Sequence, residues 1–102
     1  MSMRIIAWAN LSDYAEAHPA TRLALTQRRA VVRAAEWNTM AEAGAAFSKA
    51  KSVSGDRIRY EIAGGDYRLI VAYDFRRQVA FVKFIGTHAE YDRIDAATVA
   101  MF

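Results

Sequence analysis

The second half of the chain alternates between polar and apolar positions with a period of two residues. Residues 57–62 read Arg-Ile-Arg-Tyr-Glu-Ile, which is typical of a half-buried strand. The following Gly64-Gly65 pair favours a two-residue hairpin turn, because glycine accepts positive φ. Two further strands are predicted over Tyr67–Asp74 and Val79–Ile85, joined by a turn at residues 75–78. This half therefore predicts an antiparallel sheet of successive hairpins.

The first half reads as one short strand followed by helices. Arg4–Ala7 is a short apolar run that predicts a strand. Asn10–Ala17 predicts a helix capped by its own first residue, and His18-Pro19 ends it because proline disfavours helical geometry in the preceding residue. Helices are also predicted over the alanine-rich Thr21–Glu36 and, more briefly, over Thr39–Phe47. The order β-α-α-β-β-β predicts an α+β fold, an antiparallel sheet core with helices packed on one face.

The two turns also predict how the strands pair. The glycine turn pairs Ile62 with Tyr67, and its register continues through the pairs Glu61/Arg68, Tyr60/Leu69, Arg59/Ile70 and Ile58/Val71. A tight turn at Arg76-Arg77 predicts the pairs Tyr73/Ala80, Val71/Val82, Ile70/Lys83, Leu69/Phe84 and Arg68/Ile85. A one-residue slip would place Arg68 or Lys83 in the core, at a cost of several kcal/mol.

These registers give the sheet one uncharged face and one basic face. The uncharged face is predicted to pack under the helices and consists of Ile58, Tyr60, Ile62, Tyr67, Leu69, Val71, Tyr73, Ala80, Val82 and Phe84. The opposite face, left open, carries Arg57, Arg59, Glu61, Arg68, Ile70, Ala72, Phe81, Lys83 and Ile85. Cations around an aromatic ring suit single-stranded RNA. A structural reading stays open, in which Glu61 pairs with Arg68 and the arginines of residues 57–59 are solvated edge charges.

Composition restricts the class of protein. At 102 residues the chain is long enough for one domain, and it contains no cysteine for a disulfide or a metal site. It has neither a signal-peptide pattern nor an apolar run of the roughly 18 residues that a membrane helix needs, so we expect a cytoplasmic protein. The net charge of +3 is clustered, with four arginines and no acid in residues 22–33 and a local excess of cations in residues 49–83. Such clusters suit a polyanion, an acidic protein partner or simply solvent.

The densest polar cluster follows the last predicted strand. That strand stops at Gly86 and is followed by Thr87, His88, Glu90, Tyr91, Asp92 and Arg93. Strand ends are common places for functional sites, and histidine exchanges protons near neutral pH. The alternative is that Thr87 or Asp92 only caps a short turn, and His18 reads as a helix-end residue. No phosphate-binding glycine motif, metal-binding histidine cluster or Ser/His/Asp set is present.

Several short segments, spread over nearly the whole chain, form a specific set. They are Arg4-Ile5-Ile6, His18-Pro19, Ala35-Glu36-Trp37, Phe47, Gly65-Asp66-Tyr67-Arg68-Leu69-Ile70-Val71 and the stretch from Phe84 to Asp95, which contains Gly-Thr-His-Ala-Glu-Tyr-Asp. This set resembles the HigB-type toxins of type II toxin–antitoxin systems, within the RelE/ParE-like superfamily. Ser48 departs from the pattern, since relatives often carry proline after the phenylalanine. The resemblance implies a RelE-like fold, cleavage of ribosome-bound mRNA and a HigA-like helix-turn-helix antitoxin as partner.

The residues also suggest how RNA would be cut without a metal or other cofactor. Arg68, assisted by Lys83, would relieve charge on the scissile phosphate, because a guanidinium matches phosphate geometry. His88 is the candidate general acid or base, and Tyr91 would stack on a base or assist proton transfer. Glu90 or Asp92 would orient the imidazole. We expect the RNA itself to contact Arg57, Arg59, Phe81, Arg76 and Arg77.

Two other functions remain open from the sequence. Related folds poison DNA gyrase, as ParE toxins do, and such a protein would not need a His/Tyr cluster beside strand cations. A non-catalytic module that binds RNA or protein would use the basic face alone. Transcript cleavage, as opposed to DNA damage, separates the first alternative from the ribonuclease, and a requirement for His88 separates the second.

Overall fold

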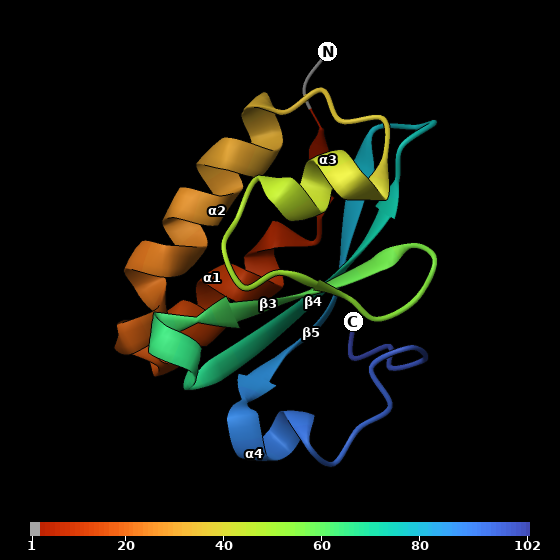
Figure 1. Ribbon diagram of the computed structural model, residues 1–102. Helices are drawn as coiled ribbons and strands as arrows, with labels where there is room; N and C mark the ends of the chain where they lie inside the picture. Colours follow the sequence, from red (N-terminus) through yellow and green to blue (C-terminus); the bar gives the residue numbers. More distant parts are fainter. Residues whose placement is uncertain (1–2) are drawn as a thin grey trace.

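The computed structural model describes residues 3–102 and contains one five-stranded sheet (Figure 1). The strands are β1 (Arg4–Ile6), β2 (Lys51–Ser52), β3 (Arg57–Ile62), β4 (Tyr67–Asp74) and β5 (Val79–Thr87). Their order across the sheet is β1-β5-β4-β3-β2. Strands β3, β4 and β5 pair antiparallel, as predicted, and β2 also pairs antiparallel with β3. Strand β1 lies parallel to β5 and makes the sheet mixed. The edge strand β2 was not predicted, and it makes β3 an inner strand.

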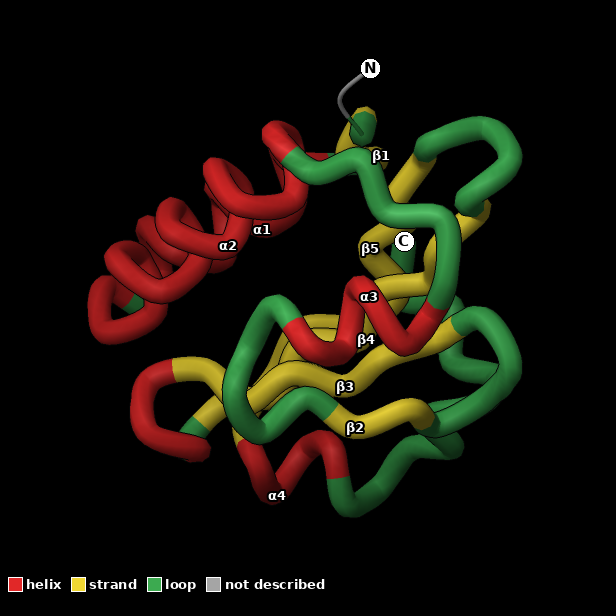
Figure 2. Tube along the Cα trace, turned by 45° about the horizontal axis from the view of Figure 1, so that its top comes forward, coloured by secondary structure: helices red, strands yellow, loops and turns green. Residues whose placement is uncertain are grey.

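The helices lie mostly on one face of this sheet (Figures 1 and 2). They are α1 (Trp8–Ala17), α2 (Arg22–Ala34), α3 (Met40–Ala45) and α4 (His88–Tyr91), with short 3-10 turns at Pro19–Thr21 and Ala63–Gly65. The α+β prediction is confirmed. The predicted N-cap of the first helix is wrong, because α1 begins at Trp8, before Asn10, and its N-cap residue Ala7 has no capping side chain. Within residues 3–102, every helix is too short or too polar to cross a membrane.

The core lies between the helices and the predicted uncharged face. Leu11 and Leu25 are almost fully buried, and they belong to one cluster with the strand residues Ile58, Tyr60, Ile62, Leu69, Val71, Tyr73, Ala80, Val82 and Ile85. Burying each large aliphatic side chain stabilises the fold by roughly 1.5–3 kcal/mol. The hydroxyls of Tyr60 and Tyr73 lie 2.6 Å apart within this core, so each polar tip has a partner. Burial raises the pKa of Tyr60 to about 12.

A β-bulge at Lys83 changes the predicted register of the second hairpin. Val71 pairs with Val82 as predicted, but Ile70 pairs with Phe84 instead of Lys83. The next two pairs are shifted in the same way, to Leu69/Ile85 and Arg68/Gly86. The extra residue in β5 exchanges the faces of the residues after it, because side chains alternate along a strand. Ile85 therefore lies in the main core, and Phe84 is buried on the opposite face.

The face predicted to be open is partly covered by the C-terminal segment. After α4 the chain turns back and ends beside the middle of the strands (Figure 1). The Met101 N–H donates to the carbonyl of Lys83 at the bulge (2.9 Å), and Nη1 of Arg57 donates to the carbonyls of Ala96 (3.2 Å) and Val99 (2.7 Å). On this face of the sheet the side chains of Ile70, Ala72 and Phe84 are buried. The sheet therefore has a second, smaller apolar layer.

Candidate functional site

A capping box positions the polar cluster at the end of β5. The Thr87 hydroxyl accepts from the Glu90 N–H (3.2 Å), and the Glu90 carboxylate accepts from the Thr87 N–H (2.8 Å). The His88 N–H donates to the carbonyl of Asp66, which ties α4 to the start of β4 (2.9 Å). The structural reading of Thr87 as a cap is thus confirmed. The capping box also fixes the direction in which the side chains of α4 project from the end of the sheet.

His88 and Asp92 form a pair on this short helix. Nδ1 of His88 lies 3.0 Å from Oδ2 of Asp92, one turn further along, and both side chains are more than half exposed (55% and 60%). A carboxylate only accepts hydrogen bonds, so Nδ1 is the donor and Nε2 is left to face a ligand. Of the two carboxylates predicted to orient the imidazole, Asp92 is the one that lies within hydrogen-bond distance of it.

Glu90, the other carboxylate predicted to orient the imidazole, takes part in the cap of its own helix. Its carboxylate is committed to the Thr87 N–H, and this hydrogen bond is the main reason why the pKa of Glu90 is lowered. A Cβ on Gly86 would lie 3.1 Å from Glu90 Oε1 and 2.6 Å from Phe84 Cζ, so a larger residue would force the Phe84 ring to shift. Tyr91 packs toward Phe84, with ring centroids 6.3 Å apart. Three features together hold α4 against β5: the small residue Gly86, the capping box and the contact between Tyr91 and Phe84.

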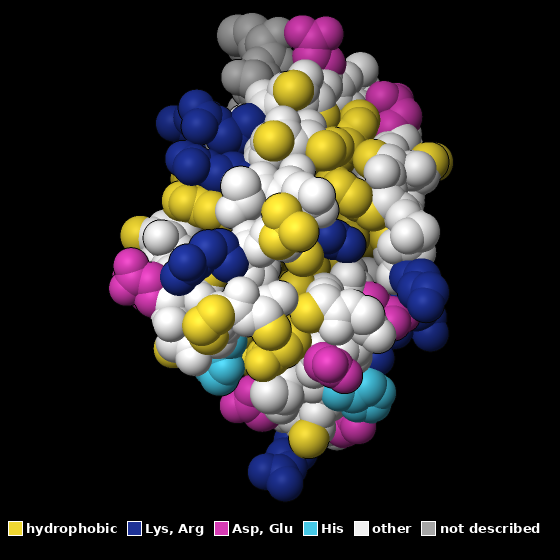
Figure 3. All heavy atoms as spheres, turned by 90° about the vertical axis from the view of Figure 1, so that its left-hand side faces the viewer, with side chains coloured by type: hydrophobic (Ala, Val, Ile, Leu, Met, Phe, Trp, Pro, Cys, Tyr) yellow, Lys and Arg dark blue, Asp and Glu magenta, His cyan; other side chains and the backbone are white. Residues whose placement is uncertain are grey.

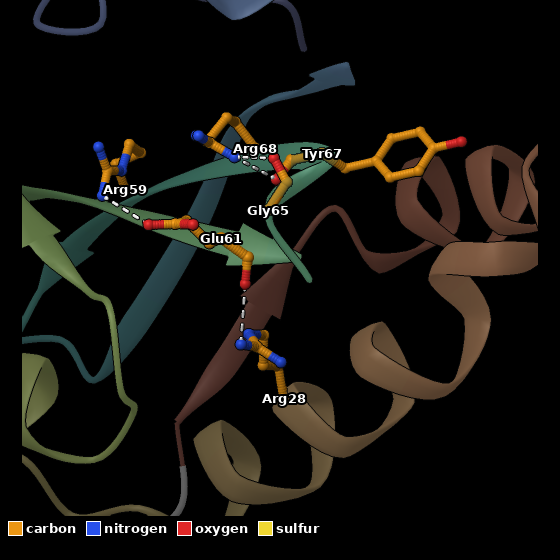
Figure 4. Close-up of polar contacts among 6 residues, drawn as sticks. All are labelled: Arg28, Arg59, Glu61, Gly65, Tyr67 and Arg68. Atoms are coloured by element: carbon orange, nitrogen blue, oxygen red, sulfur yellow. Dashed lines mark hydrogen bonds and ion pairs between the residues drawn. The ribbon is translucent and has the colours of Figure 1, made fainter. Parts of the chain in front are cut away.

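Arg68 lies on β4 directly opposite Gly86, two residues before His88. Within residues 3–102 it is the one buried charged residue (8% exposed), and Nη1 donates to the carbonyls of Gly65 and Tyr67. Figure 4 shows its guanidinium on the side of the sheet away from the Tyr67 ring, which points toward α1. Both bonds use Nη1, and Nη2 donates to no other group within residues 3–102. Arg68 and the His88 helix therefore share one end of the sheet.

Lys83 occupies a different position on the same face. Its Nζ lies 5.4 Å from the centroid of the Phe81 ring, in a shallow depression that Asp56 and Asp74 also line. Arg68 is opposite Gly86, three residues beyond Lys83, which corresponds to about 10 Å along a strand. The two predicted cations thus lie apart along the sheet, and Lys83 shares its depression with two carboxylates.

The residues expected to contact RNA are also spread along the sheet. Arg57 holds the C-terminal segment, and Arg59 pairs with Glu61 on its own strand (3.4 Å; Figure 4). Glu61 is the cross-strand partner of Arg68, but its ion pair is with Arg59. Arg76 and Arg77 are exposed at the turn between β4 and β5, at the opposite end of β4 from Arg68. Phe81 lies between the two ends.

Sequence reasoning treated His18 only as a helix-end residue, but the structure places it close to the predicted cluster. Its ring stacks on Tyr14 (centroids 4.1 Å apart) and lies edge-on to Tyr67 (5.7 Å). His18 contributes to lowering the pKa of Glu90, and burial together with Glu90 raises the pKa of Tyr14 to about 12. The end of α1 and the start of α4 are therefore neighbours, a relationship that no local pattern encodes.

The arrangement offers the components of phosphoryl-transfer chemistry. An imidazole with an oriented, exposed Nε2 can move a proton, and a guanidinium at the same sheet end can stabilise negative charge on a phosphate. Within residues 3–102, no group of three His, Asp or Glu side chains converges as a metal site would.

Comparison with known proteins gives a family that matches this reading. Residues 21–94 match the HigB toxin family, described as the RelE-like toxic component of a toxin–antitoxin system. The chain is also 30% identical over 94 residues to the mRNA interferase HigB of Escherichia coli O6:H1, covering 90% of this chain and 91% of that protein. The match includes β3 to β5 and α4, which carry Arg68 and His88. The chain belongs to the HigB family of toxins from toxin–antitoxin systems.

Proposed function

We propose that this toxin is an endoribonuclease that cleaves mRNA on the ribosome. The observation that carries the proposal is the His88–Asp92 pair at the sheet end that Arg68 shares. The similarity to an mRNA interferase supports the same substrate class. As the toxic component of its family, the chain also has an antitoxin partner, which we propose to be a HigA-like protein with a helix-turn-helix domain.

The proposed reaction is an attack of the 2′-oxygen on the adjacent phosphorus. A base removes the 2′-hydroxyl proton, the new O–P bond forms, and the 5′-oxygen leaves with a proton from an acid. The products are a 2′,3′-cyclic phosphate and a 5′-hydroxyl. Nε2 of His88 serves as one proton-transfer group, with Asp92 holding the ring. Nη2 of Arg68 binds a phosphate oxygen, where a guanidinium stabilises charge without losing its proton.

Tyr91 and Lys83 take supporting parts in this proposal. Tyr91 lies on the same short helix as His88 and offers a ring on which a base can stack. Lys83 and Phe81 bind the RNA further along the sheet, where the cation and the ring already adjoin. Arg59, Arg76 and Arg77 extend this path, and Arg57 contributes by holding the segment beside it.

A reconstituted translation reaction tests the proposal. Purified toxin is added to ribosomes translating a defined mRNA, and transcript ends are mapped by primer extension. A second mRNA without a start codon shows whether translation is required, and supercoiled DNA with gyrase is treated in parallel. We expect new ends only in the translated message, and none with His88→Gln.

The outcomes separate the parts of the proposal. Equal cleavage of the untranslated message would contradict the dependence on the ribosome but would still support endoribonuclease activity. Intact transcripts with broken gyrase-bound DNA would favour the ParE-like alternative. Undiminished cleavage by the His88→Gln toxin would remove the imidazole from the mechanism.

A further inference from the structure

A second basic surface lies on the helical side of the molecule, away from the sheet face that carries Arg68. We call it the α2 arginine groove and define it as Arg4, Trp8, Arg22, Arg29 and Arg33, which line two adjoining hollows beside α2. Figure 3 shows this side of the molecule, where Lys and Arg side chains gather next to hydrophobic ones. Nothing in the proposed cleavage reaction uses these residues.

The spacing of the arginines on α2 makes them one stripe. Arg22, Arg29 and Arg33 are seven and four residues apart, so they project from the same side of the helix. The stripe is about 16 Å long at 1.5 Å per residue. The guanidinium of Arg29 lies 4.7 Å from the centroid of the Trp8 ring, which holds the middle of the stripe in place. The middle donor of the stripe is therefore held in position.

These cations have no carboxylate partner within residues 3–102. Arg59 and Arg77 form ion pairs with acidic neighbours. Among the ion pairs formed within residues 3–102, by contrast, none involves Arg4, Arg22, Arg29 or Arg33. Arg22 and Arg33 are also exposed. A ligand with carboxylates would meet guanidinium groups that need not first leave another partner.

Other features of the groove distinguish a protein ligand from RNA. Glu16 lines the same hollow as Arg22 and Arg29, so a continuous row of phosphates would have to pass a carboxylate. A peptide can place an uncharged residue there. Leu23, the neighbour of Arg22 on α2, is 70% exposed and would be left uncovered by a phosphate backbone. Tryptophan and arginine surrounded by apolar groups are typical of protein interfaces.

We infer that the α2 arginine groove binds an acidic, amphipathic segment of a protein partner. Its carboxylates would pair with the arginine stripe, and its apolar side chains would cover Leu23. The inference deepens the expectation of an antitoxin partner, but it does not depend on RNA cleavage. A binding measurement therefore tests the inference independently of the proposed nuclease activity.

Fluorescence anisotropy with a designed peptide tests the inference. The probe is an 18-residue helical peptide with three glutamates at the spacing of the stripe and leucines on the adjoining side, and a second peptide replaces these glutamates by glutamine. Arg22→Glu/Arg33→Glu reverses two exposed cations and leaves Arg29 on Trp8. The matched control Lys49→Glu/Lys51→Glu makes the same change of charge at exposed positions elsewhere.

We expect the glutamate peptide to bind wild-type toxin and the control, and the Arg22/Arg33 variant to bind it about 10- to 100-fold more weakly. Glutamine substitution in the peptide should cause a similar loss. A failure of the glutamate peptide to bind, or equal binding by both variants, would overturn the inference. A 20-nucleotide RNA serves as a second probe. If only the Arg22/Arg33 variant binds this RNA more weakly than wild type, the groove binds RNA, and this result would also overturn the inference.

Discussion

Nδ1 of His88 lies 3.0 Å from Oδ2 of Asp92, so the imidazole is held from one side and presents Nε2 on the other. Replacing the carboxylate by an amide should let the ring turn while leaving the helix intact. We expect Asp92→Asn to lower the cleavage rate about tenfold or more, and His88→Gln to lower it by about 10²- to 10⁴-fold. Single-turnover cleavage assays would measure both. Asp13→Asn, on the exposed side of α1, is the control and should cleave like wild type.

Arg68 contributes to the fold as well as to the proposed site. Its Nη1 donates to two carbonyls around the β3–β4 turn, so Arg68→Met should remove about 1.5–3 kcal/mol from the free energy of unfolding. Urea titrations would measure this loss. Arg68→Lys should cleave poorly even at temperatures where it is fully folded, since an ammonium lacks the guanidinium fork. Full cleavage by the folded lysine variant would remove Arg68 from phosphate binding.

Gly86 offers a test of how α4 is held. A Cβ at this position would come within 2.6 Å of Phe84 Cζ, so Gly86→Ala should destabilise the protein by about 1–3 kcal/mol. A Cβ on Gly44 in α3 would meet no heavy atom within 4 Å, so Gly44→Ala should stabilise the protein by about 0.5–1 kcal/mol. Thermal melts of the two alanine variants should shift in opposite directions. Shifts of the same sign would contradict this description of β5.

Glu90 makes the stability of the protein depend on pH. Its folded-state pKa is lowered, mainly by the Thr87 N–H, so ionised Glu90 stabilises the fold at pH values above its ordinary pKa of 4.5. That contribution is lost as the pH falls through the lower, folded-state pKa. The difference in unfolding free energy between wild type and Glu90→Gln should be largest near neutral pH and shrink toward acid pH. A difference that stays constant from neutral to acid pH would contradict this role of Glu90.

The hydrogen bonds of Arg57 should hold the C-terminal segment against the sheet. Removing its bonds to Ala96 and Val99 with Arg57→Ala should speed hydrogen exchange at the Met101 N–H, which donates to Lys83 across the bulge. Lys51→Ala, on the edge strand, is the control and should leave that exchange unchanged. If Arg57→Ala exchanges at the wild-type rate, the side chain does not hold the segment.

Particular residues explain how far the sequence predicts the fold. Residues 57–62 alternate cleanly before a Gly64-Gly65 turn, and the predicted register of β3 and β4 is confirmed in every pair. The bulge at Lys83 is not visible in the same way, because Val79–Ile85 carries apolar residues on both faces and gives no period to break. The C-terminal segment has no marked pattern, and its packing depends on long-range contacts with Arg57 and Lys83.

In the candidate site, too, the sequence predicts relationships that depend on local spacing and misses those that depend on long-range contacts. The spacing Thr87-x-x-Glu90 is the pattern of a capping box, and His88 and Asp92 stand one helical turn apart, so local spacing contains both relationships. The position of the Lys83 side chain depends on the β-bulge. The His18 ring approaches the cluster only because α1 ends beside β4. The roles of Arg68, His88 and Tyr91 in cleavage remain predictions.

The most direct test is chemical mapping of the cleaved RNA in the ribosomal reaction. Once the cut position is mapped, the same message is prepared with a 2′-deoxy nucleotide on its 5′ side. The account predicts a 2′,3′-cyclic phosphate and a 5′-hydroxyl from the natural message, and no cleavage of the deoxy message. Fragments that end in a 3′-hydroxyl and a 5′-phosphate, or efficient cleavage of the deoxy message, would contradict attack by the 2′-oxygen.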